Sequence, residues 1–287
     1  LDIVTSQTRI TFPVMACLAI VWTPAPASAA AFREPAPEYQ PAAVSKVRLP
    51  PVGARPDYQL GGAYRPAGKV RIVTRDRSEA PAKGRYGICY VNAYQTQVGE
   101  EGRWEGANAD LVLRDASGRP VVDADWGEQL LDTSTASKRD RLATIVGSWI
   151  TGCAKAGYSA VEPDNLDSWT RSDSLLTKAD NLAFAKLLVS RAHAAGLAIA
   201  QKNAAEVSKQ GHRIGFDFAV AEECQVWKEC GSYTRYYGRH VIEIEYNDQP
   251  LAAFTKACKL RGRTISIIRR DRDLVAKGQP GYYARWC

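Results

Sequence analysis

The chain has 287 residues, and 45% of them are hydrophobic, which is enough to build one large α/β domain or two small ones. Lys and Arg outnumber Asp and Glu by 38 to 31, which leaves a net charge of +7. The basic residues are scattered along the chain, and the short basic run at 269–272 contains its own Asp271. This distribution favours a solvated surface and argues against nucleic-acid binding, which needs basic residues gathered with aromatic ones.

The N-terminal segment has the pattern of a secretory signal. An apolar run at 11–21 is followed by the small residues Ala27-Ser28-Ala29, which predicts a signal peptide over 1–29. A membrane anchor is the alternative, but the run is too short to cross a bilayer and Pro13 interrupts it. We therefore expect a secreted, extracellular protein without a stable membrane anchor.

Six cysteines follow the predicted signal peptide, and an even number in an exported chain favours disulfides, although the spacing leaves their pairing open. Cys224 and Cys230 are close enough to close one loop, and a pair between Cys258 and Cys287 would hold the C-terminus. A metal site is the alternative, but the chain has no CxxC or HExxH motif, so we expect no metal and no other cofactor. The six are Cys89, Cys153, Cys224, Cys230, Cys258 and Cys287.

Residues 30–56 are rich in Ala and Pro and predict a flexible linker. Beyond the linker, short apolar runs typical of strands alternate with helical patterns, and a polar, Gly-rich excursion at 100–125 separates the second strand from the third. The predicted strands lie at 70–74, 86–91, 129–131, 160–162, 198–202, 216–220, 241–245 and 264–268.

The helices between these strands have clear limits. In 138–156 apolar residues recur at steps of three and four, and Gly157 follows as a stop. Thr177 and Asp180 have the spacing of a capping box at the start of the next helix. Alternating strands and helices with short connections predict a parallel sheet. Because eight strands are predicted, we expect an α/β fold of the closed (β/α)8 type, a TIM barrel, as a single domain over 57–287.

Polar residues follow most of the predicted strands directly, where a barrel of this kind carries its active site. Charged side chains are costly inside a barrel, so their concentration at one rim predicts a polar pocket. Taken alone, Asp76 or Asp167 has the simpler interpretation of a cap or a surface ion pair. The residues at the predicted strand ends are Asp76, Asn92, Asp132, Glu162, Asp164, Asp167, Lys202, Asn203, Glu222, Glu223 and Glu245.

Two acidic clusters at strand ends suggest a glycosidase, because glycosidic cleavage needs two carboxyl groups across one bond. Since proline generally ends regular strand pairing, Pro163 predicts that Glu162 points into the barrel mouth while Asp164 opens the following loop. In the second cluster, neighbours on a strand face opposite sides, so we expect only one of Glu222 and Glu223 to face the substrate.

Lys202 ends the strand between the two acidic clusters, so it is placed to keep a neighbouring carboxylate ionised, whereas opposed carboxylates favour a protonated acid. Aromatic residues in the following loops fit sugar binding, but core packing explains them equally well. These residues are Trp169, Trp227, Tyr233, Tyr236 and Tyr237.

Six segments, in order from about residue 57 to the C-terminus, resemble glycoside hydrolase family 114, whose members are endo-α-1,4-polygalactosaminidases. The sequence is closest in character to secreted bacterial members. One departure is Ala221, where many members have Asn, which leaves the fine specificity open. The segments are Asp57-Tyr58-Gln59-Leu60-Gly61-Gly62, Cys89-Tyr90-Val91-Asn92-Ala93, Val161-Glu162-Pro163-Asp164-Asn165, Gln201-Lys202-Asn203, the stretch from Phe216 to Cys224, and Glu243-Ile244-Glu245-Tyr246.

The resemblance implies a (β/α)8 barrel that hydrolyses α-1,4-linked galactosamine polymers internally and needs no metal. It also implies that Asp164 and Glu222 form the acidic pair and that Glu162 and Lys202 line the site. With the strand-end residues, the candidate substrate-binding set is Asp76, Tyr90, Asn92, Asp132, Glu162, Asn165, Lys202, Asn203 and Glu245.

We therefore expect a secreted, monomeric glycosidase whose partner is a polysaccharide. Deacetylated galactosamine is cationic, and an acidic rim would attract it locally because salt screens the distant positive charges over about 8 Å. Retention with Glu222 as general acid is favoured, but the carboxyl separation decides between retention and inversion. The alternatives are a barrel glycosidase acting on another α-linked polymer and a carbohydrate-binding barrel without catalysis.

Overall fold

The computed structural model describes residues 47–287. The predicted signal peptide and most of the predicted linker lie outside the described residues. Among residues 47–287, no helix is both long and apolar enough to cross a membrane.

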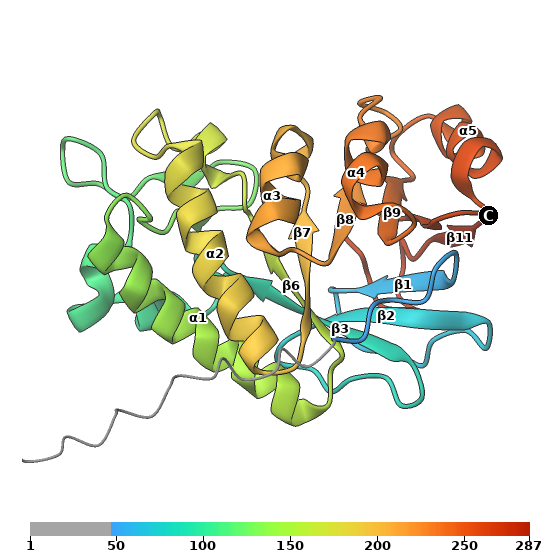
Figure 1. Ribbon diagram of the computed structural model, residues 1–287, viewed down its shortest axis with the longest axis horizontal. Helices are drawn as coiled ribbons and strands as arrows, with labels where there is room; N and C mark the ends of the chain where they lie inside the picture. Colours follow the sequence, from blue (N-terminus) through green and yellow to red (C-terminus); the bar gives the residue numbers. More distant parts are fainter. Residues whose placement is uncertain (1–46) are drawn as a thin grey trace, which may run out of the picture. The chain divides into compact units, whose positions relative to one another are not determined.

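The described residues form a barrel of parallel strands (Figure 1), which confirms the predicted (β/α)8 single-domain fold. Each barrel strand pairs in parallel with the next one along the chain, and a short antiparallel strand, β11 (Ala284–Trp286), lies beside the last of them. The barrel strands in order are β1 (Arg55–Gln59), β2 (Val70–Asp76), β3 (Tyr86–Asn92), β6 (Ala160–Asp164), β7 (Ala198–Lys202), β8 (Phe218–Glu222), β9 (Val241–Tyr246) and β10 (Ser266–Arg270).

Two of the strand predictions need correction. Residues 129–131 contribute no barrel strand, because Glu128–Gln129 (β5) pairs instead with Val122–Asp123 (β4) in a separate two-stranded sheet. The first barrel strand is β1, which spans the predicted boundary between the linker and the domain and was not predicted as a strand. Its residues are mostly polar, so it lacks the apolar run by which the other strands are recognised.

The barrel closes between β1 and β10 through a buried arginine. Arg270 on β10 is fully buried; it donates to the carbonyl oxygen of Tyr58 and lies 3.5 Å from the Asp57 carboxylate, both on β1. Part of the interior is an apolar cluster that contains Ile72, Phe218 and other side chains from alternate strand positions. Such alternation is expected where every strand turns one face to the barrel axis.

The segment before β1 packs against the amino ends of the strands. The guanidinium of Arg48 donates to Ser159 Oγ at 2.8 Å, and the carbonyl of Arg48 accepts from the Tyr86 hydroxyl at 2.6 Å. Val47 and Leu49 pack on the interior cluster. Residues 47–54 therefore cover the end of the barrel opposite to the predicted rim.

Five α-helices flank the strands from β3 onward, whereas in the described residues β1, β2 and β3 are joined by irregular segments (Figure 1). The capping box that Thr177 and Asp180 predict is present, and Gly157 ends α1 in the left-handed conformation, with φ of 94°. The helices are α1 (Ala136–Ala156), α2 (Lys178–Ala194), α3 (Ser208–Ile214), α4 (Cys230–Tyr237) and α5 (Leu251–Arg261).

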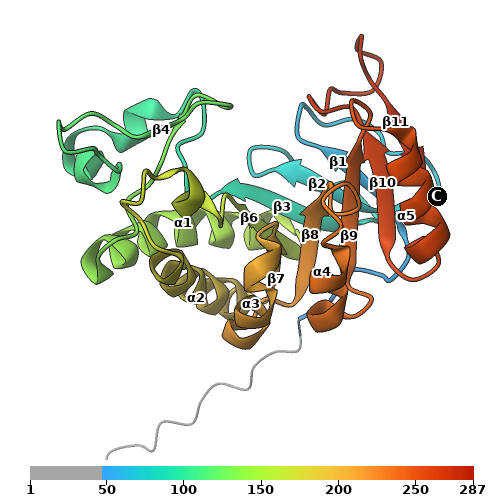
Figure 2. The same cartoon turned by 90° about the horizontal axis from the view of Figure 1, so that it is seen from above.

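The excursion between β3 and α1 forms a group of turns above α1, at the side of the barrel (Figure 2). It contains two short 3-10 helices, η1 (Glu101–Trp104) and η2 (Gly106–Leu111), and the β4–β5 hairpin. Leu111 and Leu131 are fully buried in the main core, whereas Leu130 packs with Leu113, Val121 and Leu176 in a small separate cluster.

All six cysteines of the described residues form disulfides, namely Cys89–Cys153, Cys224–Cys230 and Cys258–Cys287. The first joins β3 to α1, the second closes the loop after β8, and the third holds the C-terminus on α5. The two pairings suggested by spacing are confirmed.

Removal of the disulfide between β3 and α1 should cost considerable stability. Its cysteines are 64 residues apart, and a cross-link over such a distance restricts the unfolded chain strongly. We expect Cys89→Ala/Cys153→Ala to lower the free energy of unfolding by about 2–5 kcal/mol. Urea denaturation followed by circular dichroism measures this change, and an unchanged midpoint would contradict it.

Candidate active site

A cavity of about 720 Å³ lies at the carboxyl ends of the barrel strands. Side chains at the ends of β3, β6, β7, β8 and β9 form its floor, and the β4–β5 hairpin and the loops after β6, β8 and β10 form its walls. The floor residues include Tyr90, Asp164, Lys202, Glu222 and Tyr246.

One ammonium group joins the two acidic clusters. Lys202 Nζ lies 3.1 Å from Asp164 Oδ2 and 3.1 Å from Glu222 Oε2, and 3.5 Å from Glu162 Oε1. Lys202 is almost completely buried, and burial alone would lower its pKa. The surrounding acidic groups outweigh burial and raise the pKa of Lys202 well above its usual value, so the ammonium stays charged.

The same contacts limit the distance between Asp164 and Glu222. Because Oδ2 and Oε2 are each 3.1 Å from one nitrogen, they can be no more than twice that distance apart. Carboxyl groups lie roughly 5–5.5 Å apart in retaining glycosidases and about 6.5–9.5 Å apart in inverting ones. This limit on the two oxygen atoms is compatible with the retaining separation.

Asp164 is surrounded by donors. Its Oδ2 accepts from the Tyr90 hydroxyl at 2.9 Å as well as from Lys202, and its Oδ1 accepts from the backbone N–H of Asn165 at 2.8 Å. Burial alone would raise the pKa of Asp164, but the Lys202 ammonium, the Asn165 amide and the Tyr90 hydroxyl together hold it below its usual value. Asp164 is therefore a carboxylate at neutral pH.

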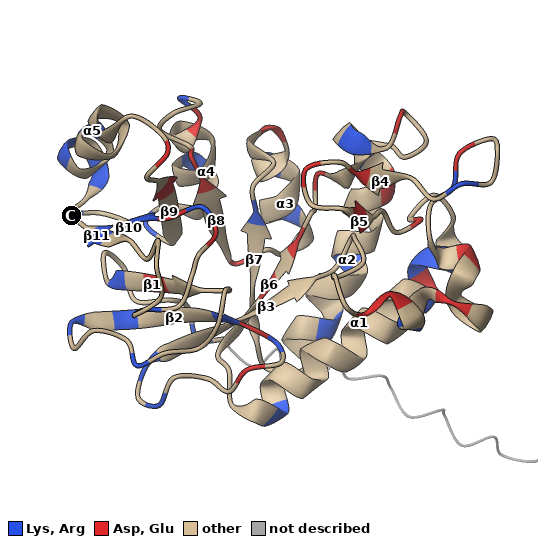
Figure 3. Cartoon of the chain, turned by 180° about the vertical axis from the view of Figure 1, so that it is seen from behind, with Lys and Arg blue, Asp and Glu red and all other residues tan. Residues whose placement is uncertain are grey.

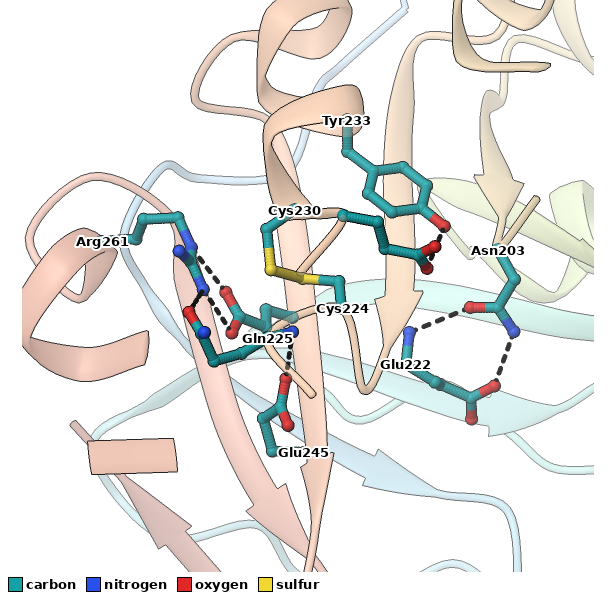
Figure 4. The surroundings of a disulfide bond; sticks show 10 residues. Asn203, Glu222, Cys224, Gln225, Cys230, Tyr233, Glu245 and Arg261 are labelled. Atoms are coloured by element: carbon teal, nitrogen blue, oxygen red, sulfur yellow. Dashed lines mark hydrogen bonds and ion pairs between the residues drawn. A yellow bond between two sulfur atoms is a disulfide. The ribbon is translucent and has the colours of Figure 1, made fainter. Parts of the chain in front are cut away.

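Glu222 is oriented by side chains from both neighbouring strands. Asn203, just after β7, donates to Oε2 at 2.8 Å and accepts from the Glu222 backbone N–H at 2.9 Å (Figure 4). On the other side, the hydroxyl of Tyr246 on β9 donates to Oε1. These contacts fix the carboxyl group at the cavity floor, where it is about one-fifth exposed, at 22%.

Glu162 lies directly below Asp164 on the same face of β6. The strand continues through Pro163 to Asp164, because the ladder between β6 and β7 ends at Val161 and the proline interrupts no pairing with β7. The expectation that the proline separates the two carboxylates is therefore wrong. Glu162 Oε1 accepts from the Tyr58 hydroxyl at 2.5 Å, and burial raises the pKa of Glu162 to about 7, although Lys202 opposes the shift.

Both members of the second acidic pair reach the cavity. β8 ends at Glu222, and Glu223 adopts a positive φ of 55°, so the alternation of a strand no longer applies and the prediction that only one faces the cavity is wrong. Arg272, after β10, lies 2.6 Å from Glu223 Oε1, pairs with Asp248 and covers the ring of Tyr246. It thus holds the loops after β8, β9 and β10 together.

The model of the glycoside hydrolase family GH114 matches residues 36–287. The chain belongs to family GH114. It is therefore a glycoside hydrolase, as the acidic clusters suggest. No curated protein matches the sequence.

Solved structures of low sequence identity share the fold. The chain is similar to Ega3 of Aspergillus fumigatus, solved in complex with galactosamine, with 22% identity, a TM-score of 0.66, and coverage of 84% of this chain and 97% of that one. It is also similar to the glycoside hydrolase domain of PelA from Pseudomonas aeruginosa, with 17% identity, a TM-score of 0.54, and coverage of 78% and 97%.

The cavity of this glycoside hydrolase is strongly acidic although the chain carries a net charge of +7; Figure 3 shows where acidic and basic residues lie along the ribbon. Three basic residues, Arg171, Lys202 and Arg272, line it. Eleven acidic residues line it as well, namely Asp76, Asp123, Asp125, Glu128, Asp164, Asp167, Glu206, Glu222, Glu223, Glu229 and Asp273. A concave site lined by one sign of charge concentrates ligands of the opposite sign, so the cavity favours cations.

The structure brings most of the predicted site residues together. Glu162 lies beneath the floor, and Asp76 reaches the cavity while capping Ser78, with Oδ1 accepting from the Ser78 backbone N–H at 2.8 Å. The other predicted residues that line the cavity are Tyr90, Asn92, Asp164, Asn165, Lys202, Asn203 and Glu222.

Asp132 and Glu245 do not line the cavity. Asp132 lies before α1, where it pairs with Lys138 at 2.5 Å; its prediction followed from the misplaced strand at 129–131. Glu245 is buried behind β9, with Oε1 accepting from the Gln225 N–H at 3.0 Å (Figure 4). Ile244 and Tyr246 take the inward positions, so alternation turns Glu245 outward. Burial, with a contribution from Glu243, raises its pKa to about 8.

Sequence patterns missed several residues of the site, among them Tyr58, Tyr246, Trp126 and Glu128. Tyr58 belongs to β1, which was not predicted, and Tyr246 has the sequence pattern of an ordinary core aromatic residue. Trp126 and Glu128 lie in a polar excursion that has no periodicity. Among the aromatic residues proposed for sugar binding, Trp227 lines the cavity, whereas Tyr233 and Tyr237 are buried in the core.

One grouping among the described residues has a spacing that could suit a metal ion, namely Cys224, Cys230 and Glu243. Because the two cysteines are joined in a disulfide, neither offers a thiolate, and metals bind cysteine as the thiolate. The grouping therefore does not fit a metal ion.

Proposed function

We propose that the enzyme is a secreted endo-acting hydrolase of α-1,4-linked, galactosamine-containing polysaccharide, which acts with retention of configuration. Asp164 is the nucleophile and Glu222 the general acid and base. The observation that carries this proposal is the shared contact of both carboxylates with Lys202, because it holds the two carboxyl groups close together on the cavity floor, as a retaining mechanism requires.

In the first step, Asp164 attacks the anomeric carbon of the sugar while the glycosidic bond breaks. The proton of Glu222 moves to the departing oxygen, and a covalent glycosyl–enzyme ester forms on Asp164. Lys202, Tyr90 and the Asn165 N–H keep Asp164 ionised and oriented for the attack.

In the second step, Glu222 removes a proton from water, and the water oxygen attacks the same carbon from the side that the leaving group vacated. The ester bond breaks and Asp164 returns as a carboxylate. Asn203 and Tyr246 hold Glu222 in position for both proton transfers. Two inversions at one carbon leave its configuration unchanged.

Charge supports galactosamine as the sugar. The acidic cavity suits a polymer whose deacetylated residues carry ammonium groups, and Ega3, whose fold this chain shares, was solved with galactosamine. The three disulfides support export, because disulfides persist mainly in oxidising compartments. Exposed Trp126 and Trp227 on different walls of the cavity support binding of several consecutive sugars.

The test is to incubate the purified enzyme with deacetylated α-1,4-galactosamine polymer and to follow reducing ends, product lengths and the anomeric proton by NMR. We expect a rapid fall in polymer length and initial release of the α anomer, because both the attack and the hydrolysis invert one centre. A double variant, Asp164→Asn/Glu222→Gln, controls for contaminating hydrolases.

Each alternative substrate, function or stereochemical course predicts a different outcome. Release of reducing ends from another α-linked polymer, with none from galactosamine polymer, would overturn the substrate. Polymer binding without any release of reducing ends would indicate a binding barrel instead. Initial release of the β anomer would contradict retention.

A further inference from the structure

We propose that the β4–β5 hairpin carries a hexosamine subsite beside the catalytic pair, where Trp126 stacks on a sugar ring and Glu128 binds its ammonium group. This inference rests on the proposed function and deepens it, since it names residues that would distinguish a deacetylated sugar from an acetylated one.

The hairpin is firmly attached to the rim near Asp164. Asp123 on β4 is buried, and its Oδ2 accepts from Gln95 Nε2 at 3.1 Å and lies 2.8 Å from Arg171 Nε. Arg171 belongs to the loop after β6, the strand that ends at Asp164. The hairpin is thus a fixed wall of the cavity on the Asp164 side.

Trp126 lies in the turn of this hairpin and lines the cavity with 61% of its surface exposed. An exposed indole exposes a large apolar area to water, and such surfaces commonly mark binding sites. The apolar C–H face of a sugar ring can cover an indole face. Trp126 therefore offers a stacking platform for a sugar in the same cavity as the catalytic pair.

Glu128 follows two residues later and also lines the cavity. Its Oε2 accepts from Asn92 Nδ2 at 2.8 Å, and Asn92 Oδ1 accepts in turn from Asn165 Nδ2 at 2.9 Å. These bonds fix the carboxyl group relative to Asn165, the neighbour of Asp164. Within residues 47–287, the other oxygen of Glu128 has neither a hydrogen-bond donor nor a basic partner.

A bound cation would stabilise the charged form of Glu128, which the surroundings of this side chain disfavour. Burial, followed by the charges of Asp164 and Asp123, raises the pKa of Glu128 to about 7, although Asn92 opposes the shift. The charge of Arg171 also opposes the rise in the pKa of Glu128, but this guanidinium is already paired with Asp123 and Asp167. An ammonium group would pair with the free oxygen, whereas an acetamido group brings no positive charge.

The test measures binding separately from catalysis. Titration calorimetry with an inert Glu222→Gln enzyme compares a deacetylated α-1,4-galactosamine oligosaccharide with its fully N-acetylated form. Adding Glu128→Gln should weaken binding of the deacetylated form about 10- to 100-fold, the usual effect of losing a bond to a charged group, and leave the acetylated form unchanged. Adding Trp126→Ala should weaken both forms about 5-fold, because stacking involves the ring and not the charge.

The matched control is Glu105→Gln, which removes the same charge from an exposed residue of the same excursion that does not line the cavity. It should leave both affinities unchanged. If the parent binds both sugars and Glu128→Gln weakens neither, or both equally, the subsite is overturned while the proposed function stands. If the wild-type enzyme cleaves no galactosamine polymer, the proposed function itself fails, and the inference fails with it.

Discussion

Asp164→Asn is expected to lower kcat on galactosamine polymer by about 10⁴-fold or more, in the range seen when a catalytic nucleophile is removed. Asparagine keeps the size of the side chain and one oxygen that can accept from Tyr90 or Lys202. It lacks the negative charge that forms the bond to the anomeric carbon. Reducing-end release measures kcat, and circular dichroism checks that the variant folds.

Two experiments make this prediction specific. Asp173→Asn makes the same chemical change at an exposed residue of the loop after β6, outside the cavity, and should keep full activity. Asp164→Ala supplied with azide should form a β-linked glycosyl azide, because the small anion attacks from the vacated side. If Asp164→Asn turns over normally, or if azide yields only the α product, Asp164 is not the nucleophile.

Glu222→Gln is expected to lower kcat about 10³-fold on the polymer, since a general acid contributes roughly 10²- to 10⁴-fold. Glutamine can still bond to Asn203 and Tyr246, but it cannot release a proton to the departing sugar oxygen. Steady-state release of reducing ends measures the loss.

A substrate with a better leaving group distinguishes a general-acid role of Glu222 from a purely structural role. An aryl α-galactosaminide with an acidic phenol needs no proton to depart, so Glu222→Gln should release the first equivalent of phenol in a rapid burst. A slow phase should follow, because no general base activates the water. A variant that is equally slow on the aryl substrate and the polymer, without a burst, would contradict the assignment.

Much of the barrel could be predicted from the sequence because most of its strands are apolar runs of their own. β7 and β9 are buried on both faces, as parallel strands between helices usually are. β1 is different: its buried Asp57 and Gln59 are satisfied by Arg270, Arg75 and Tyr64, which lie elsewhere in the chain. No local pattern reveals such a strand. The sequence therefore predicts eight strands only by counting residues 129–131, which do not belong to the barrel.

The candidate site likewise contains residues that could be predicted from the sequence and residues that could not. Asp164, Lys202, Asn203 and Glu222 follow recognisable strands, so their common rim follows from the parallel order of the sheet. Glu245 was predicted at the rim because it lies near the end of a strand. Its position along the strand does not reveal which face of the sheet its side chain occupies, and the structure turns it outward.

The sequence by itself determined most of the barrel strands, the family, and the two carboxyl groups with a lysine between them. These features are local, since strand periodicity and motif spacing depend on residues that are close together in the sequence. The tertiary structure alone decided that Asp164 and Glu222 share one ammonium, that Tyr58 and Tyr246 support the acidic cluster, and that a distant hairpin forms a wall of the cavity. Such contacts depend on how separate strands and loops meet in space, which no short stretch of sequence specifies.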